Sequence, residues 1–255
     1  MTNQSRRRFI GNAAAAGLSG CFLPVTGTTA VNSVQPEKRL KNNSVILFQG
    51  DSITDGNRGR NEDPNHIMGH GYAFSIASRV GVDFPKKNYK FYNRGISGHK
   101  ITDLADRWQK DTLDLNPDIL SILVGVNDAA SVVFSRPPVV TVEKYEETYD
   151  ALLQQTRDIN PEILFILCEP FILKVGKVAE NWEVYHADID KRREVVKKLA
   201  AKFDAVFVPS QETFNDACKK APAEYWMWDG VHPTVAGHEL LAREWMNQVE
   251  KRISF

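Results

Sequence analysis

Short apolar runs alternate along this chain with longer stretches in which apolar residues recur at helical spacing. Five runs bounded by Gly, Pro, Asn or Asp predict strands at residues 45–48, 90–92, 119–124, 163–167 and 205–208. Between and after them, apolar positions three and four residues apart predict helices at about 72–80, 101–115, 142–160, 182–203 and 234–253. In the last of these, Leu241, Trp245 and Val249 repeat every four residues.

This alternation of strands and helices predicts an α/β fold. Successive βαβ units form a parallel sheet that is covered by helices on both faces. Five strands fit a three-layer α/β/α sandwich of the flavodoxin-like type. Ligands of such sheets bind beyond the carboxyl ends of the strands. Ser52, Gly95 and Asn127 each come just after a predicted strand, so we expect them at one edge of the sheet.

Composition and charge narrow the class of protein. The chain has 255 residues, of which 42% are hydrophobic and 25% charged, enough for one large core. Its 32 basic and 32 acidic residues cancel, whereas a nucleic-acid-binding protein shows a basic excess. No cysteine or histidine spacing is typical of a zinc or iron–sulfur site, so we expect no metal and no cofactor.

The first thirty residues are typical of an export signal. Residues 5–10 contain Arg6, Arg7 and Arg8 and resemble the twin-arginine motif of bacteria. The Ala- and Gly-rich stretch that follows is too short and too weakly apolar to remain as a membrane span. Two processing routes stay open: a lipobox that ends at Cys21, whose thiol would carry the lipid, or cleavage after Ala30.

The rest of the chain divides into a polar linker at residues 31–43 and one domain at 44–255. We expect the domain to be exported, either free in the periplasm or held at the membrane as a lipoprotein. Two further cysteines lie in the domain. Cys168 follows an apolar run and is expected to pack as a small hydrophobe, so free thiols are favoured over a bond to Cys218.

Two distant segments carry candidate chemistry. Ser52 stands on a turn directly after the first predicted strand, preceded by Gly50, which permits a tight backbone. Asp229 and His232 lie three residues apart before the last predicted helix. Serine is a weak nucleophile until a base accepts its proton, and a His held by an Asp is such a base. Taken singly, each segment is also an ordinary turn or helix entry.

Four segments that occur in a fixed order argue against the turn interpretation for all of them. They are residues 48–56, 93–98, 125–128 and 229–233. Together they resemble the sequence blocks of the SGNH hydrolases, also called GDSL esterases and lipases. The resemblance extends from about residue 45 to the C-terminal helix and implies the flavodoxin-like SGNH hydrolase fold.

The resemblance implies a role for each matched residue. Ser52 is the nucleophile, His232 is the general base and later the acid, and Asp229 orients His232. The oxyanion hole would combine the backbone N–H groups of Ser52 and Gly95 with the side-chain amide of Asn127. Losing one such donor typically raises the barrier by about 3 kcal/mol. This chemistry requires no metal or cofactor.

Other residues lie where they could contact a substrate. Trp226 and Trp228 come just before Asp229, and their rings suit a sugar face, an acyl chain or simple packing. Glu169 follows the fourth predicted strand and is either a substrate contact or a charged loop end. The polar segment 57–71 follows the nucleophile block and forms either a wall of the active site or a plain surface loop.

The chain as a whole also resembles the xylan and rhamnogalacturonan acetylesterases of the family, including the run through His66, His70 and Tyr72. The leading hypothesis is therefore an exported serine esterase that removes O-acetyl groups from carbohydrates such as xylan or pectin fragments. The alternative hydrolase is a lysophospholipase or thioesterase, which acts on longer acyl chains. A catalytically silent carbohydrate-binding protein is the alternative outside the enzymes. The sugar, the ester position and the oligomeric state are not fixed by the sequence.

Overall fold

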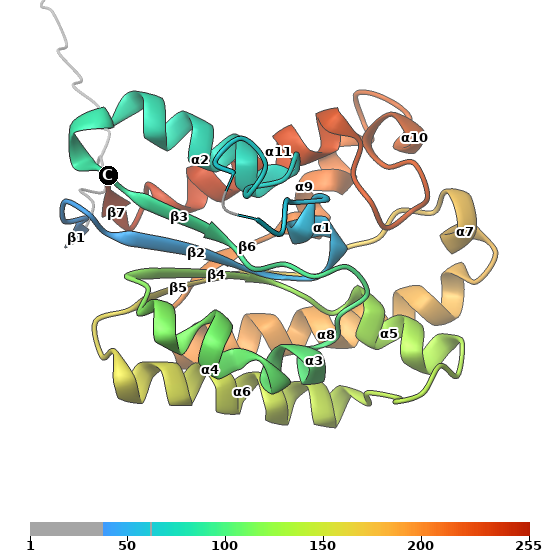
Figure 1. Ribbon diagram of the computed structural model, residues 1–255. Helices are drawn as coiled ribbons and strands as arrows, with labels where there is room; N and C mark the ends of the chain where they lie inside the picture. Colours follow the sequence, from blue (N-terminus) through green and yellow to red (C-terminus); the bar gives the residue numbers. More distant parts are fainter. Residues whose placement is uncertain (1–37, 62) are drawn as a thin grey trace, which may run out of the picture. The chain divides into compact units, whose positions relative to one another are not determined.

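The computed structural model describes residues 38–61 and 63–255 of the chain (Figure 1). The predicted export signal, with Cys21, and the first part of the predicted linker lie outside these residues and stay predictions. The described residues belong to one compact unit, and the fold below is that unit.

A five-stranded parallel sheet forms the middle layer, as predicted. Its spatial order is β3-β2-β4-β5-β6, and every neighbouring pair is parallel. Each strand overlaps the apolar run that predicted it. The strands are β2 (Val45–Gly50), β3 (Lys90–Asn93), β4 (Ile119–Leu123), β5 (Leu164–Cys168) and β6 (Val206–Val208).

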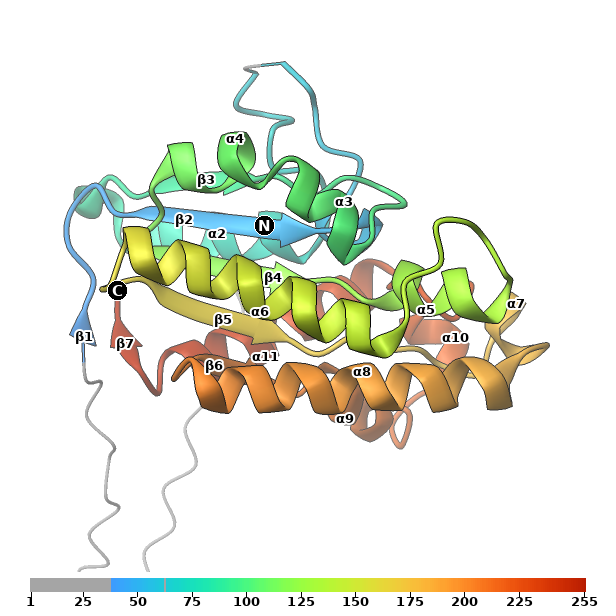
Figure 2. The ribbon, with the colours of Figure 1, turned by 90° about the horizontal axis from the view of Figure 1, so that it is seen from below.

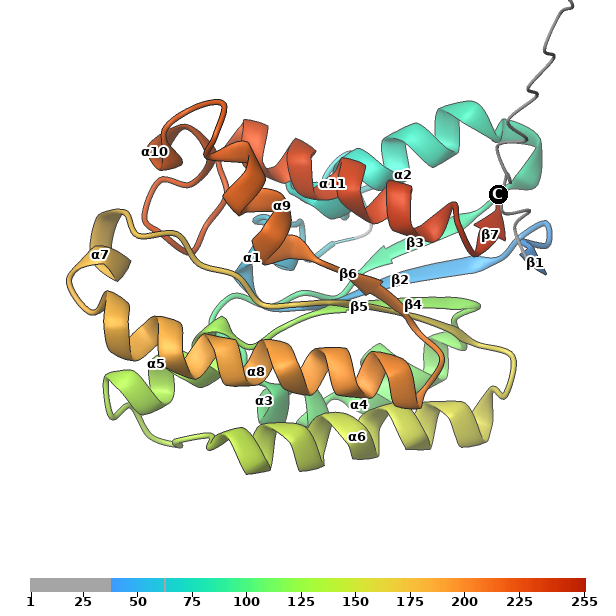
Figure 3. The same ribbon diagram turned by 180° about the vertical axis from the view of Figure 1, so that it is seen from behind.

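Helices cover both faces of the sheet and complete the predicted sandwich (Figures 1 and 3). One face carries α2 (Tyr72–Asp83), α9 (Ser210–Ala217) and α11 (Val235–Val249). The other carries α3 (Ile101–Asp106), α4 (Trp108–Asp111), α6 (Val142–Ile159) and α8 (Trp182–Lys202), and Figure 2 shows α6 and α8 side by side beneath the sheet. The shorter helices are α1 (Ser52–Asp55), α5 (Val126–Val133), α7 (Gly176–Ala179) and α10 (Ala223–Trp226), with 3₁₀ turns η1 (Pro85–Lys87) and η2 (Leu113–Leu115).

Two cores lie on either side of the sheet and explain why its central strands are mostly apolar. In β2, Phe48 faces the core that contains Tyr72 and Trp245, whereas Leu47 faces the core that contains Trp108. Successive strand residues point to opposite faces, so a strand buried on both sides has no polar face. The indole N–H of Trp245 donates to Ser121 Oγ at 3.0 Å, which satisfies the polar atoms of both side chains inside the core.

The segment predicted as one helix at 101–115 consists of α3, α4 and η2. The chain leaves the helical conformation at Arg107 (φ −117°, ψ 8°) and again at Thr112 (φ −134°, ψ −60°). The guanidinium of Arg107 donates to Gln49 Oε1 at 2.9 Å and to the carbonyl of Arg94 at 2.7 Å. These tertiary hydrogen bonds hold Arg107 in a non-helical conformation, in which its side chain reaches Gln49 and Arg94. The periodicity of the sequence does not reveal such partners.

Both ends of the described domain differ from the prediction. Ile253, the last residue of the predicted C-terminal helix, instead begins β7 (Ile253–Ser254), which pairs in parallel with β1 (Lys38–Arg39). Leu40 is buried, and its N–H donates to the carbonyl of Ser254 at 2.9 Å. The prediction that residues 38–43 are only a linker is therefore wrong, because the C-terminal strand gives them a partner that the local sequence does not show.

Cys168 and Cys218 are free thiols, as predicted. Cys168 is buried in β5, and burial raises the pKa of its thiol to about 12. Within residues 38–61 and 63–255, no helix is both long and apolar enough to cross a membrane.

Candidate active site

The carboxyl ends of the strands gather the predicted site at one edge of the sheet. Ser52 opens α1 directly after β2, and Asn127 lies in the first turn of α5, after β4. β2 and β4 are neighbours, although β3 comes between them in the sequence. The chain changes direction across the sheet at this point, which is where open α/β sheets bind ligands.

Ser52 and His232 are joined by a hydrogen bond across 180 positions of sequence. Ser52 Oγ lies 2.7 Å from His232 Nε2. Asp51 caps α1, because its Oδ1 accepts from the N–H of Ile53 at 3.0 Å. The cap fixes the turn after β2 and so the direction of the serine side chain.

Asp229 holds the other side of the histidine ring. Its Oδ2 lies 2.7 Å from His232 Nδ1, while Oδ1 accepts from the backbone N–H groups of Val231 and His232 at 2.9 and 2.8 Å. One short loop therefore orients the carboxylate and the imidazole together. With a proton on Nδ1, Nε2 is left as an acceptor that faces the serine hydroxyl.

The charges of this pair stabilise each other. Burial raises the pKa of Asp229, but its hydrogen bonds with the His232 side chain and with backbone N–H groups outweigh burial and lower the pKa to about 2. The same hydrogen bond from Asp229 raises the pKa of His232 above its ordinary value, against the opposing effect of burial. The arrangement can accept a proton from Ser52 and hold it as an imidazolium.

The side-chain amide of Asn127 is fixed in a position from which it can donate a hydrogen bond. Its Nδ2 donates to the carbonyl of His99 at 3.1 Å, which fixes the amide and uses one of its two N–H groups. The β3–α3 loop, which contains His99, is thereby tied to the start of α5.

The N–H of Gly95, which the resemblance assigned to the oxyanion hole, already has a hydrogen-bond partner. This group donates to Asn93 Oδ1 at 2.9 Å, and the residue is buried. A Cβ at this position would lie 2.4 Å from the backbone nitrogen of Asp55, so glycine is needed here for close packing against α1. The prediction that the Gly95 N–H serves an oxyanion hole is therefore corrected, because this donor already has a partner.

Gly98, three residues further along the same loop, has the properties expected of the missing donor. It is exposed, its φ is +85°, and open space surrounds the position where a Cβ would be. Its N–H has no hydrogen-bond partner in the part of the chain that the structure describes. The next residue is His99, which accepts from Asn127, so the loop presents Gly98 beside the fixed amide.

Of the three residues predicted to bind substrate, only Trp228 lies against the histidine. Its ring centroid is 6.1 Å from that of His232 at an interplanar angle of 26°, and 66% of the residue is exposed. The indole N–H of Trp226 instead donates to the carbonyls of Ala217 and Ala221, which packs α10 against the end of α9.

Glu169 is a structural residue, contrary to the prediction that it contacts substrate. It is buried, and its Oε1 accepts from the N–H of Gln211 at 2.9 Å, in the first turn of α9. Burial raises the pKa of this carboxyl. Its other oxygen, Oε2, lies 3.9 Å from Arg193 Nε, so both oxygens face protein groups.

The segment after the nucleophile folds back on α1 through backbone hydrogen bonds. The N–H of Gly59 donates to the carbonyl of His66 at 2.7 Å, and that of His70 to Gly56 at 2.9 Å. Within residues 38–61 and 63–255, no three His, Cys, Asp or Glu side chains are grouped to hold a metal.

Two buried carboxyl groups lie close to the site in the sequence, and neither of them has a functional role assigned from the sequence. Asp51 and Asp128 are both fully buried, and burial raises the pKa of Asp51 to about 7 and that of Asp128 to about 6. Each accepts one backbone N–H, from Ile53 and Ile101 respectively. Their positions were visible in the sequence blocks, but their burial was not.

The fold and this geometry are compatible with an ester hydrolase, and sequence comparison gives the class. The chain belongs to the GDSL-like lipase/acylhydrolase family, whose profile matches residues 48–240. It is a carboxylic ester hydrolase. An acetylxylan esterase of Geobacillus stearothermophilus is 31% identical over 216 residues, which cover 83% of this chain and 96% of that protein.

Solved structures of a lipase and an esterase are similar to the chain over most of its length. A GDSL-like lipase from Parabacteroides merdae is 41% identical with a TM-score of 0.80, over 85% of this chain and all of that one. The structure of the Geobacillus acetylxylan esterase has a TM-score of 0.73 over 83% of this chain and 96% of its own. A lipoprotein of Bacillus subtilis is 31% identical over 90 residues, which are 35% of this chain and 37% of that protein.

Proposed function

We propose that the protein is a serine esterase that hydrolyses O-acetyl esters on carbohydrates such as xylan or pectin fragments. The observation that carries the proposal is the continuous chain from Ser52 Oγ through His232 to Asp229, with two contacts of 2.7 Å. The substrate class is supported by the relative described as an acetylxylan esterase, which matches most of both chains.

In the proposed mechanism, Ser52 attacks the carbonyl carbon of the acetyl ester while His232 Nε2 takes its proton. The imidazolium that forms is stabilised by Asp229 and then gives the proton to the leaving sugar hydroxyl. Water repeats the sequence on the acetyl-enzyme and releases acetate. Among the relatives, variants of the Geobacillus enzyme that replace a serine, a histidine or an aspartate are described as catalytic mutants. That aspartate and histidine are three positions apart, like Asp229 and His232.

Three neutral donors would stabilise the oxyanion in this mechanism: the N–H of Ser52, the N–H of Gly98 and the side-chain amide of Asn127. Gly98 replaces Gly95 in this proposal, because the N–H of Gly98 is free and that of Gly95 is not. Donors that are fixed before the reaction need no reorganisation when charge develops on the carbonyl oxygen.

Trp228 is the proposed platform for the sugar that carries the acetyl group. Its exposed face adjoins His232, which must reach the leaving hydroxyl. Trp228→Ala is expected to raise KM for acetylated xylo-oligosaccharides about tenfold, equivalent to about 1.4 kcal/mol. KM for 4-nitrophenyl acetate should stay unchanged, because this ester has no sugar ring.

Tyr225→Ala is the matched control, because Tyr225 is also exposed but packs on Trp226. Initial rates over a range of oligosaccharide concentrations measure both variants. An equal rise of KM in the two would remove Trp228 from the proposed subsite.

The first test is acetate release from acetylated xylan and acetylated pectin by the wild type and by Ser52→Ala. We expect release by the wild type and a loss of at least about a thousandfold in the variant, since the nucleophile is gone. Circular dichroism controls for folding. Acetyl and octanoyl esters of 4-nitrophenol should be compared in parallel. Octanoyl turnover far above acetyl turnover would favour the lysophospholipase or thioesterase alternative.

We also propose that the enzyme is exported and carries a lipid on Cys21. The twin-arginine and lipobox motifs support this, as does the relative described as a lipoprotein. In a bacterial host, Cys21→Ser should move the protein from the membrane fraction to the soluble fraction. If the wild type and the variant were both in the soluble fraction, cleavage after Ala30 would be favoured instead.

A further inference from the structure

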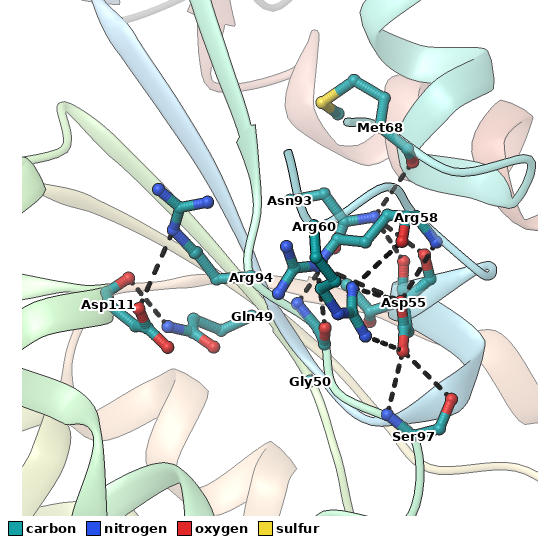
Figure 4. Close-up of polar contacts among 12 residues, drawn as sticks. Gln49, Gly50, Asp55, Arg58, Arg60, Met68, Asn93, Arg94, Ser97 and Asp111 are labelled. Atoms are coloured by element: carbon teal, nitrogen blue, oxygen red, sulfur yellow. Dashed lines mark hydrogen bonds and ion pairs between the residues drawn. The ribbon is translucent and has the colours of Figure 1, made fainter. Parts of the chain in front are cut away.

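Asp55, at the end of α1, is the most heavily bonded carboxylate near the nucleophile. The residue is 2% exposed and lies one helical turn after Ser52. Its two oxygens accept hydrogen bonds from three other residues: Arg58, Arg60 and Ser97. Figure 4 shows these residues converging on Asp55 from two different loops.

The first of these loops is the one that carries Gly98. Asp55 Oδ2 accepts from both the N–H and the Oγ of Ser97, each at 3.0 Å. The residue before them, Ile96, donates its N–H to the carbonyl of Gly50 at 3.1 Å. On the other side of Gly98, His99 accepts from Asn127. Gly98 therefore lies between two anchors, and Asp55 is the charged one.

The second loop follows the nucleophile block. Asp55 Oδ1 accepts from the N–H of Arg58 at 3.2 Å and from Arg60 Nη1 at 3.0 Å, while Oδ2 accepts from Arg60 Nη2 at 2.7 Å. This fork on both oxygens is the geometry in which arginine binds a carboxylate most strongly. Arg58 Nε reaches across to the carbonyl of Gly95 at 3.0 Å and links the two loops directly.

Asn93 adds a neutral link between the same segments. Its Nδ2 donates to the carbonyls of Thr54 and Met68 at 2.7 and 3.0 Å, and its Oδ1 accepts from Gly95. Asn93 thus holds the start of the loop, while Asp55 holds its middle, next to Gly98.

The ionised state of Asp55 is favoured by these partners. Burial raises the pKa of the carboxyl, but the hydrogen bonds from Arg60 and Ser97 outweigh burial and keep the pKa below its usual range. All the groups bonded to its two oxygens donate hydrogen bonds. In Asp55→Asn, the NH₂ group would therefore face donors where the carboxylate oxygen accepted from them.

We infer that Asp55 is a positioning residue for catalysis, which holds the loop carrying Gly98 in the geometry of the oxyanion hole through Ser97. Asp55 touches no reacting atom and acts through the backbone of residues 96–98. The inference rests on the proposed function, since it gives Gly98 a part in stabilising the oxyanion.

The position of an oxyanion donor affects the transition state more than substrate binding. An interaction made only in the transition state lowers kcat when it is lost, whereas KM changes little. A general loss of structure would lower the amount of active enzyme and the stability of the fold together. A fall in kcat with little change in KM and in the stability of the fold therefore indicates positioning, whereas a joint loss of active enzyme and stability indicates a structural role.

The test compares Asp55→Asn with the wild type on 4-nitrophenyl acetate. We expect kcat to fall about 10- to 100-fold, less than the loss typical of deleting a donor, with KM within about twofold. The rate at which a 4-nitrophenyl alkylphosphonate inactivates Ser52 should fall by a similar factor. In that reaction Ser52 Oγ bonds to phosphorus, 4-nitrophenolate leaves, and the phosphoryl oxygen occupies the oxyanion position.

Asp63→Asn is the matched control. It removes the same charge from the loop that follows α1, but Asp63 is bonded to Asn65 and not to the Gly98 loop. Its kcat should equal that of the wild type. An equal loss in both variants would indicate a long-range charge effect and overturn the inference.

Ser97→Ala keeps the test valid if Asp55→Asn fails to fold. Ser97 is exposed, and this change removes only the Oγ bond to Asp55, so a fall of kcat of about three- to tenfold is expected. A kcat within experimental error of the wild type in Ser97→Ala, or within twofold in a folded Asp55→Asn, overturns the inference.

Ser52→Ala in the same assay separates this failure from failure of the proposed function. If the wild type is active and Ser52→Ala is not, a normal Asp55→Asn enzyme contradicts only the role of Asp55. If Ser52→Ala is as active as the wild type, the proposed nucleophile is wrong, and the inference falls with it.

Discussion

At the scale of single residues, the reactivity of Ser52 comes from its neighbours. A serine hydroxyl does not ionise near neutral pH, so its attack depends on transfer of the proton to His232 along a contact of 2.7 Å. Asp229 decides which nitrogen of the ring is free to accept. The two backbone N–H groups on Asp229 Oδ1 hold the carboxylate still, which makes this loop a preformed unit.

The pKa of His232 leads to a prediction for the pH profile. The enzyme needs neutral His232, and the bond to Asp229 favours the charged form, so kcat/KM should rise with pH through a midpoint above the ordinary 6.5. Asp229→Asn removes the stabilising charge and should move the midpoint down, with a large loss of rate. Initial rates of acetyl ester hydrolysis from pH 4 to 9, corrected for spontaneous hydrolysis, measure both. A flat wild-type profile would exclude His232 as the base.

Residue identities in the site could be predicted from the sequence to the extent that they lie in short blocks. Ser52, Asp229 and His232 lie together in the structure as the blocks implied. Gly95 and Gly98 are glycines of one block, and the hydrogen bond from Gly95 to Asn93, which distinguishes them, is visible only in the structure. Asp55 stood in the first block without an assignment, since its partners at positions 60 and 97 become neighbours only after folding.

At the scale of elements, α11 connects the histidine loop to the body of the protein. Its N-cap is Thr234, two residues after His232. The hydroxyl of Thr234 accepts from the N–H of Gly237 at 3.2 Å and donates to the carbonyl of Tyr225 at 2.7 Å. The cap therefore fixes both the start of the helix and the return of the chain from α10. Strands and long helices followed their periodicity, whereas the segment 101–115 broke where Arg107 found tertiary partners.

Thr234→Ala should destabilise the fold by about 1–2 kcal/mol, the usual effect of losing a side-chain cap. It should also lower kcat several-fold, because the chain that positions His232 loses an anchor. Thr141→Ala is the matched control, since Thr141 caps α6 in the same way. Urea unfolding and acetyl ester turnover measure the two effects. If both variants lost stability and neither lost activity, the α11 cap would have no part in positioning the base.

At the scale of the whole molecule, buried titratable groups make stability depend on pH. His238 in α11 accepts from the N–H of Tyr72 through Nδ1 at 3.2 Å, which joins α11 to the start of α2. Burial, followed by the charges of His70 and His232, lowers the pKa of His238 to about 4. Between pH 6.5 and 4 the unfolded chain binds more protons at this position, so its contribution to stability falls as pH falls.

His238→Gln should remove this pH dependence. Between pH 7 and pH 5, the wild type should lose roughly 2 kcal/mol relative to the variant, from the difference between the ordinary pKa of 6.5 and about 4. Urea unfolding at the two pH values gives the result. A slope in His238→Gln equal to that of the wild type would show that another group carries the effect.

The layers, the strands and the identities of Ser52, His232 and Asp229 follow from the sequence alone. Strands buried on both faces must be apolar, and the carboxyl ends of parallel strands must meet at one edge, so local patterns contain this information. The tertiary structure alone decided which glycine has a free N–H, that Glu169 is internal, and that residues 38–39 pair with 253–254. It also decided that Asp55 joins two loops. Each of these depends on whether a polar group is already satisfied by a partner far away in the chain, and such partners leave no periodic signal in the sequence.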